Sequence, residues 1–479
     1  MVVAAVVSFI ATWIGASDNA IRLLLSLFAG YPLAFLYRRW IILHPAPVKH
    51  IFFTVCGLVL CYFNFGDAVS HSLVNILVDY VILCLIPGTA LSVALAFIFN
   101  TFYLMAGYYK VETDDYQIMW TMPHCVLTLR LTSIIFDVYD GRRKQNKVEL
   151  TPDQAQTALE KTPSLLEIFG HCYYFGGFLI GPQFSMRRYL DFIDGAFQKT
   201  KGEPPDSVYP GVKRLLLGLV YIVIFQTGNL LVPDDYLLSL DFENVNFLAR
   251  CAYVLIWGKL VLMKYVGSWL LAEGSIIISG LSYNGKDENG IAKWDGCTNV
   301  NLSKLESAVT FHHVIQSFNI NTNMWMSKYI FKRMRFLGNK FVSQGVTLLY
   351  LAVWHGLHTG YYMCFMLEFF MTNAQNQLGS LIDAIPKLKD FVQQPSIKIV
   401  LWGISKIITT FSLSYALVGF GLLTIPKWTK VYASIYYIGH VVFLGWPVVY
   451  FLLKKFVLPR KRAVNGIQNT HTSEEKKDT

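Results

Sequence analysis

Charged side chains are scarce in this sequence, and their scarcity excludes the commonest class of protein. Only 15% of the 479 residues are Asp, Glu, Lys or Arg, whereas soluble domains contain about 25%. Apolar residues make up 54% of the chain and gather in blocks. These blocks are about 15–25 residues long, the length that a helix needs to cross the hydrocarbon of a bilayer. An ordinary soluble domain is therefore excluded.

Several other patterns are absent. Alternating segments of about ten residues, typical of transmembrane β-barrels, do not occur. The eight cysteines contain no Cys-x-x-Cys pair, so neither a zinc ribbon nor a disulfide framework is indicated. Residues 1–15 are apolar but lack a basic segment, so we interpret them as a retained interfacial helix and not as a cleaved signal peptide. We therefore predict an all-α polytopic integral membrane protein.

The apolar blocks predict about eleven transmembrane helices in one membrane-embedded domain, residues 1–458. One block, residues 247–281, is long enough for two crossings or for one crossing and a tilted segment. The predicted spans are residues 21–36, 51–65, 73–86, 89–109, 118–136, 164–181, 212–232, 247–281, 344–371, 397–423 and 433–453.

Basic residues give the chain a net charge of +10 and lie at the ends of apolar blocks, as at 38–39 and 454–455. This placement is typical of residues that set membrane topology and argues against nucleic-acid binding. The polar tail 459–479 contains Lys476 and Lys477, the fourth and third residues from the end. They resemble the dilysine retrieval signal of endoplasmic reticulum membrane proteins. We therefore expect the endoplasmic reticulum and a cytosolic tail; a charged tail without an address is the alternative.

Among the eleven histidines, His355 has a distinctive position. It follows the apolar run 348–354, and an ionisable side chain within a membrane is costly unless it functions or is paired. Imidazole is also the side chain best suited to proton transfer near neutral pH. His358 and Tyr362 follow at i+3 and i+7, so on a continuous helix the three would share one face. A catalytic base with polar, substrate-binding neighbours is one interpretation, and a structural histidine is the other.

Two other kinds of chemistry are conceivable for the histidines and the cysteine of this region. His355 and His358 could in principle ligate a metal together with His312 and His313, but the further His boxes of di-iron membrane enzymes are missing. We therefore predict no metal site. Cys364 lies nine residues after His355, about 180° away around a helix, which is a poor position for activation as a nucleophile.

The long connector 282–343 contains a second polar feature. Asn319, Asn321 and Asn323 alternate with other residues just before an apolar block. Asparagine is common in turns and caps, so a purely structural role is one interpretation. A role in chemistry is the other.

A cationic stretch follows directly, with five cations and no acid between Lys328 and Lys340. On a helix it would lie at the membrane surface. It could equally neutralise a phosphate-rich ligand such as coenzyme A, because Arg and Lys are the usual phosphate partners. Lys328, Lys332 and Arg333 are the candidate substrate-binding residues of this stretch.

These residues resemble a known family. Trp354-His355-Gly356 in a long apolar block, with Asn319 lying 36 residues upstream, is similar to the membrane-bound O-acyltransferase family. Within it, the sequence resembles the branch of type 3 lysophosphatidylcholine acyltransferases, and the resemblance covers residues 20–460. The resembling stretches are residues 120–129, 181–186, 255–259, 292–295, 318–323, 329–332 and 354–358.

The resemblance implies a buried catalytic tunnel enclosed by about eleven helices. It places the family's invariant histidine at His355, as general base, and the conserved asparagine at Asn319. That asparagine would either orient the acceptor or donate to the oxyanion. A base in apolar surroundings stays neutral more readily, which suits a proton acceptor. Phe318 stands where many members have Trp, which leaves the asparagine itself in place.

The resemblance also implies a reaction. A polyunsaturated acyl chain would pass from acyl-CoA to the sn-2 hydroxyl of lysophosphatidylcholine, lysophosphatidylethanolamine or lysophosphatidylserine in phospholipid remodelling (the Lands cycle). Acyl-CoA is a co-substrate, so no cofactor is expected. The partners would be these substrates and the bilayer, and a homodimer stays open. A membrane transporter and a protein O-acyltransferase of the same family are the alternatives. Transporters commonly show repeats and paired broken helices, and neither is apparent in this sequence.

Overall fold

The structure is a computed structural model and describes residues 2–198, 202–203 and 206–456. In these residues every regular element is a helix, and strand-like pairing is confined to two isolated antiparallel bridges. The predicted all-α class is therefore confirmed. Helices satisfy their backbone hydrogen bonds internally, which is the requirement that hydrocarbon imposes on a spanning segment. The predicted tail 459–479 with its dilysine-like end lies outside the described residues.

Seven helical segments of the described chain are long and apolar enough to cross a membrane. A multi-pass membrane protein is thus confirmed, whereas the predicted count of eleven is not. Exposed Leu and Val side chains cover the surface of these segments, as contact with lipid requires. The segments are α2 (Asp18–Arg39), Ala46–Leu85 with α3 (Ala46–Phe65) and α4 (Val69–Leu85), α5 (Ala90–Val111), α10 (Val208–Leu231), α13 (Phe247–Ser279), α20 (Pro395–Leu422) and α22 (Ile438–Phe456).

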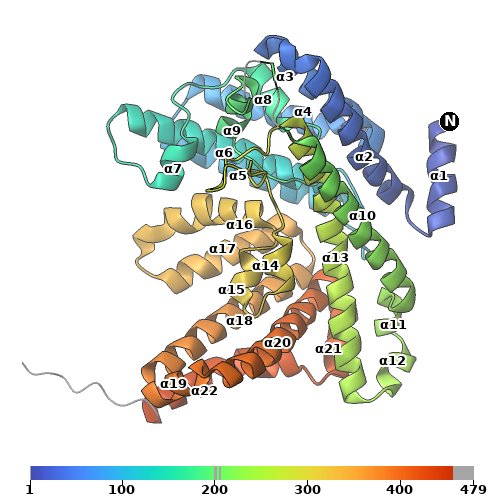
Figure 1. The fold of residues 1–479 in the computed structure, drawn as a ribbon, viewed down its shortest axis with the longest axis vertical. Coiled ribbons are helices and arrows are strands. Elements are labelled where there is room, and N and C mark those ends of the chain that lie inside the picture. Colours follow the sequence, from blue (N-terminus) through green and yellow to red (C-terminus); the bar gives the residue numbers. More distant parts are fainter. Residues whose placement is uncertain (1, 199–201, 204–205, 457–479) are drawn as a thin grey trace, which may run out of the picture.

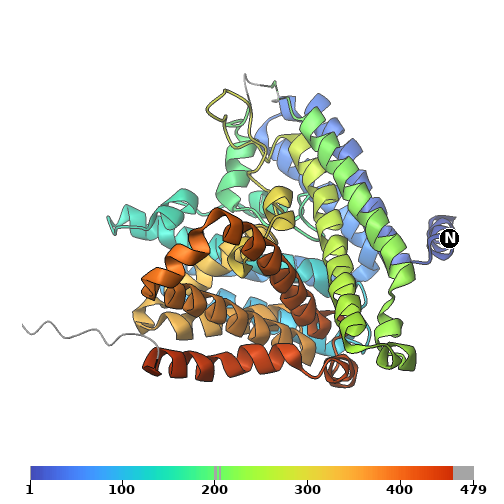
Figure 2. The same cartoon turned by 60° about the horizontal axis from the view of Figure 1, so that its bottom comes forward.

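The N-terminal helices and the C-terminal helices form two groups, with α10 and α13 along one side (Figure 1). Helix α13 connects the groups, because it packs on α2 and α10 and also on α20. Figure 2 shows α10 and α13 side by side along most of their length. The remaining helices of the N-terminal group are α1 (Val2–Ile14), η1 (Ile41–Leu43), η2 (Gly66–Ala68), α6 (Thr121–Gln145), α7 (Pro152–Thr157), α8 (Leu165–Cys172) and α9 (Met186–Ile193). Two short helices, α11 (Asp234–Leu237) and α12 (Leu240–Asn244), follow α10 and lie near the C-terminal helices.

One predicted span, residues 164–181, is wrong. Only α8 is helical in this stretch, and the chain then turns within the protein core. The cause is Arg130, a fully buried residue of α6 whose guanidinium donates to the carbonyl oxygens of His171 at 2.8 Å, Cys172 at 3.0 Å and Gly177 at 2.7 Å. These carbonyls are thereby satisfied without a continuing helix.

Two other predicted spans have a different form. Residues 247–281 contain one continuous helix, α13, and not two crossings. Residues 344–371 break at Gly356 into α17 (Lys340–His355) and α18 (Thr359–Ala384). The last predicted span is preceded by a separate helix, α21 (Ile425–Ser434), and α19 (Pro386–Gln393) precedes α20.

The connector between α13 and α17 is an ordered part of the fold. It passes between the two groups of helices and carries the polar segment 299–323 to the break between α17 and α18 (Figure 1). Its helices are α14 (Leu302–Glu306), α15 (Phe311–Ile315), α16 (Ile320–Met326), the π-helix η3 (Ser327–Phe331) and the 3-10 helix η4 (Lys332–Leu337).

Candidate active site

A cavity of about 670 Å³ lies where α16, the α17–α18 break, α13 and α20 meet. His355 and Asn319 both line it, although they come from separate parts of the chain. Aromatic side chains form much of its wall near the histidine, including Tyr361, Phe365 and Phe420. Such a wall suits a ligand with a long apolar part, because ligand sites are mostly apolar with a few placed polar groups.

His355 is the last residue of α17 and is fixed by ring contacts. Its imidazole stacks on Phe365, with ring centroids 5.3 Å apart, and meets Phe420 edge-on at 5.0 Å. Trp354 lies edge-on at 4.7 Å. Neither imidazole nitrogen has a hydrogen-bond partner among the described residues, so packing alone orients the ring. A base held in this way keeps its nitrogens available to a ligand in the cavity.

Gly356 makes the helix break that exposes this ring. Its backbone φ of 145° lies in the region that favours glycine. A Cβ at this position would lie 2.2 Å from the Glu112 Oε1 atom and 2.9 Å from the Tyr361 ring. The Glu112 carboxylate accepts the backbone N–H of Leu357 at 3.0 and 3.2 Å. Glu112 therefore supplies the acceptor for a backbone amide that the break leaves without a helical partner.

The residue before His355 is held from the N-terminal half of the chain. The indole of Trp354 donates to the carbonyl oxygen of Cys125 at 2.8 Å, and the Tyr108 hydroxyl donates to the Trp354 carbonyl at 2.8 Å. Helices α5 and α6 thus fix the end of α17 through two polar contacts. Tyr108 and Glu112 carry no signal in the sequence beyond their positions at the end of an apolar block.

The prediction that His355, His358 and Tyr362 share one helical face is wrong. The break at Gly356 places His355 at the end of α17, whereas His358 precedes the first residue of α18. His358 lines the cavity, so substrate contact by it stays a prediction. Tyr361, and not Tyr362, lines the cavity and packs against the His355 ring.

Asn319 has an unusual backbone conformation directly before α16. Its φ and ψ are 50° and 44°, a left-handed conformation that asparagine tolerates better than most residues. Its Oδ1 accepts a hydrogen bond from Asn299 at 3.3 Å. Asn323 instead donates to the carbonyls of Ile315 and Phe318, which is the structural role weighed above. Asn319 and Asn323 both line the cavity, and the side chain of Asn323 also holds the turn.

The three cations predicted to bind substrate, Lys328, Lys332 and Arg333, contact carboxylates of the protein instead. Each forms an ion pair with a carboxylate, and none is among the residues that line the cavity. The pairs are Lys328 with Asp137 at 3.2 Å, Arg333 with Asp140, and Lys332 with Asp153. Phosphate binding by these side chains stays a prediction, and their observed contacts attach the connector to α6 and α7.

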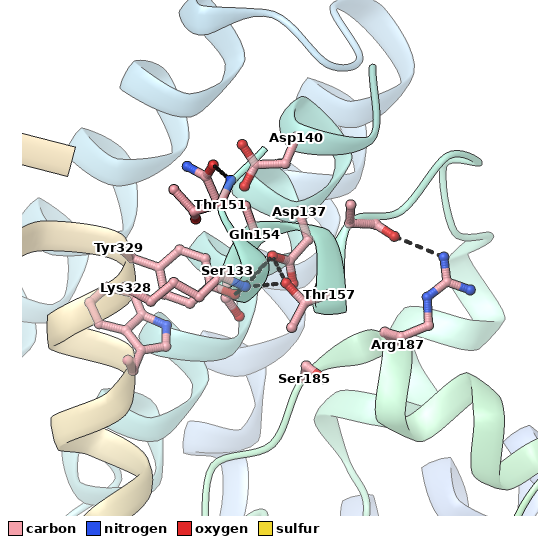
Figure 3. A network of polar contacts seen from close by, with 12 residues as sticks. Ser133, Asp137, Asp140, Thr151, Gln154, Thr157, Ser185, Arg187, Lys328 and Tyr329 are labelled. Carbon is pink, nitrogen blue, oxygen red and sulfur yellow. Dashed lines mark hydrogen bonds and ion pairs between the residues drawn. The ribbon is translucent and has the colours of Figure 1, made fainter. Parts of the chain in front are cut away.

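Asp137 is the centre of this attachment (Figure 3). Its side chain is fully buried and accepts hydrogen bonds from Tyr329 at 2.8 Å and Thr157 at 2.6 Å. Burial raises the pKa of Asp137, and the Lys328 ammonium opposes that rise. Because an unpaired buried carboxylate is costly, Lys328 is required for the stability of this contact.

The structure provides no arrangement of the described residues that would make Cys364 a nucleophile or the histidines metal ligands. Cys364 lines the cavity but has no hydrogen-bond partner among the described residues. His312 and His313 lie on α15, and the imidazole of His312 contacts Gln316. In the described chain no group of three or more His, Cys, Asp or Glu residues could hold a metal ion.

Comparison with known proteins identifies the class to which this fold and this cavity belong. Residues 105–418 match the model of the membrane-bound O-acyltransferase family, and the chain belongs to that family. The resemblance stated from the sequence is confirmed.

Individual relatives narrow the comparison. A Mus musculus protein named Lysophospholipid acyltransferase 5 is 45% identical to this chain, over 94% of this chain and 92% of its own length. A Drosophila melanogaster protein of the same name is 39% identical, over 98% and 95%. The Mus musculus Membrane-bound glycerophospholipid O-acyltransferase 2 is 28% identical, over 90% and 83%.

The helix break predicts a sharp sensitivity at Gly356. In Gly356→Ala the new Cβ must displace Glu112 or Tyr361, and a displacement of about 1 Å near reacting atoms can lower a rate about 10²-fold. We expect acyl transfer to fall by about that factor. The matched control is Gly345→Ala in the same helix, where the nearest atom to a built Cβ is 3.8 Å away. Equal rates for the two variants would contradict the role of the break.

The buried ion pair predicts an asymmetry in stability. Lys328→Met leaves the Asp137 carboxylate buried without its cation, which should destabilise the fold by about 3–5 kcal/mol. Adding Asp137→Asn removes the buried charge, so the double variant should regain most of that loss. Thermal unfolding in detergent measures both, with Lys340→Met, an exposed lysine nearby, as the control. A double variant less stable than Lys328→Met would contradict the pairing argument.

Proposed function

We propose that this chain is a lysophospholipid acyltransferase that moves an acyl chain from acyl-CoA to the sn-2 hydroxyl of lysophosphatidylcholine. The observation that carries the proposal is the meeting of His355 and Asn319 on the wall of one largely apolar cavity. Family membership supports O-acyl transfer, and the names of the relatives support a lysophospholipid as the acceptor. In enzymological terms the chain would be an acyl-CoA-dependent 1-acylglycerophosphocholine O-acyltransferase.

The first chemical step belongs to His355. One of its nitrogens takes the proton from the sn-2 hydroxyl while the hydroxyl oxygen attacks the carbonyl carbon of the thioester. A general base of this kind contributes about 10²–10⁴-fold to the rate. The tetrahedral intermediate then breaks its carbon–sulfur bond, coenzyme A leaves as the thiolate, and the imidazolium returns the proton to sulfur. Because a thioester is already activated, no acyl-enzyme is needed.

The second role belongs to Asn319, which lies on the same cavity wall. Its amide either orients the acceptor hydroxyl or donates to the oxygen on which negative charge develops. A donor of the second kind is worth about 10²–10³-fold. His358, which also lines the cavity, would contact substrate. The phosphates of coenzyme A would be neutralised by Lys328, Lys332 and Arg333 of the connector.

The wider setting follows from the same proposal. Lysophosphatidylethanolamine and lysophosphatidylserine would be further acceptors, and the donor would be a polyunsaturated acyl-CoA. The reaction would remodel phospholipids in the endoplasmic reticulum membrane, with the C-terminal tail in the cytosol and no cofactor beyond the co-substrate. The mostly apolar wall of the cavity supports acyl chains as ligands.

The test uses the purified full chain in liposomes with arachidonoyl-CoA and a panel of lysophospholipids. Release of free coenzyme A should depend on lysophosphatidylcholine and should fall about 10²–10⁴-fold in His355→Ala, because the general base is lost. His44→Ala is the matched control, since His44 is exposed and lies outside the residues that line the cavity. It should keep the parent rate.

Each result decides something. A parent chain that releases no coenzyme A with any lysophospholipid would reject the proposal. Release that instead requires a peptide hydroxyl would replace it with a protein O-acyltransferase. Full activity in a folded His355→Ala variant would remove the general base from the mechanism.

A further inference from the structure

Polar contacts connect Asn319 to an ion pair between α13 and α10. The residues involved are Asn299, which contacts Asn319 directly, and Glu273, which holds the backbone at Asn299. We infer that Asn299 and Glu273 are positioning residues that turn the amide N–H₂ of Asn319 toward the cavity. This inference rests on the proposed function only for its effect on the rate.

The first step concerns which atom of Asn299 is the oxygen. The backbone N–H of Asn321 lies 3.1 Å from the Asn299 Oδ1, and a backbone N–H can only donate. The side-chain amide of Asn321 also contacts this oxygen, at 3.2 Å. The orientation of the Asn299 amide is therefore fixed by the backbone, and its Nδ2 must be the atom that faces Asn319.

The second step carries this polarity to Asn319. Since the Asn299 Nδ2 is a donor, the atom that it meets at 3.3 Å must be the acceptor, Oδ1 of Asn319. The Asn319 Nδ2 has no hydrogen-bond acceptor among the described residues, and Asn319 lines the cavity. The amide that faces the substrate is thus a donor. A donor can stabilise a developing oxyanion, whereas it cannot accept the proton of an acceptor hydroxyl.

The third step explains what holds Asn299 itself. The Glu273 Oε1 accepts the backbone N–H of Asn299 at 2.7 Å and that of Val300 at 3.2 Å. The other carboxylate oxygen lies 3.3 Å from the Arg214 Nε. Glu273 is 2% exposed, so its charge is compensated inside the protein by Arg214 and by two backbone dipoles. Helices α10 and α13 therefore anchor the loop that carries Asn299.

Backbone pairing completes the connection to the start of α16. The Asn299 carbonyl oxygen accepts the N–H of Ile320 at 3.0 Å, and Val300 forms an isolated antiparallel bridge with Phe318. Residues on both sides of Asn319 are thereby tied to the loop that Glu273 holds. This pairing also accounts for the left-handed backbone at Asn319, because the chain must turn there to enter α16 directly after the bridge.

The decisive variant is Asn299→Asp. A carboxylate still accepts the Asn321 N–H, but it cannot donate to Asn319. The Asn319 amide should therefore rotate, give its N–H₂ to Asp and turn its oxygen to the cavity. We expect kcat to fall about 10–100-fold with a nearly unchanged KM for acyl-CoA, because only a transition-state interaction is lost. Asn301→Asp is the matched control, since the Asn301 side chain accepts the backbone N–H of Lys304, as Asp also can.

A double-mutant cycle separates positioning from general damage. In the Asn319→Ala background, Asn299→Asp should lower kcat no further, because the amide that it misorients is already gone. The same fold-loss in both backgrounds would overturn the inference, and so would full activity of Asn299→Asp when Asn319→Ala is impaired. Thermal unfolding in detergent identifies variants that are merely unfolded.

A measurement that needs no activity tests the anchor directly. Hydrogen exchange should show protected amides at residues 299–300 and 320–321 in the full chain. Glu273→Ala should speed exchange at both pairs together, whereas Glu273→Gln, which retains an accepting oxygen, should preserve much of the protection. Unprotected amides in the parent chain, or exchange unchanged in Glu273→Ala, would overturn the anchor even if the proposed acyltransferase activity were absent.

Discussion

The site depends on one hydrogen bond, which the backbone N–H of Leu357 donates to Glu112 because it has no helical acceptor. The chain leaves the helical path at Gly356, so this N–H needs an acceptor within a largely apolar region, and Glu112 supplies it. The break turns His355 into a helix end that faces a cavity instead of one more residue inside a continuous span. Glu112 is 245 residues away from Leu357 in the sequence. The site therefore forms only when both groups of helices are assembled.

The sequence was sufficient to predict an all-helical chain with several membrane-spanning segments. Apolar blocks predicted the spans that become α2, α5, α10 and α20 because segment length and composition determine whether a helix can cross a bilayer. The same reasoning failed at residues 164–181, which are also largely apolar. There the outcome is set by a buried guanidinium on another helix, Arg130, and window composition contains no information about such a partner.

The sequence predicted the central residues of the candidate site but not their neighbours. His355 and Asn319 were identified from the sequence, and both line the cavity. Spacing along an assumed continuous helix then selected Tyr362, whereas the break brings Tyr361 to the ring. Charge alone selected Lys328 as a phosphate ligand, whereas Asp137 pairs with it in the structure. A linear pattern shows which residue types are present, and it does not show which of them are already paired.

Two ion pairs with a buried carboxylate have the same structural role. Asp137 with Lys328 and Glu273 with Arg214 lie on different helices, and both pairs hold segments of the connector between α13 and α17. Short helices are only marginally stable by themselves, so the connector depends on its contacts with the rest of the protein. Hydrogen-bonded charges are directional, and breaking a buried pair is strongly unfavourable. The cationic stretch is therefore attached to α6, and the loop that contacts the asparagine segment is attached to α13. Together these contacts fix the position of the connector relative to the cavity.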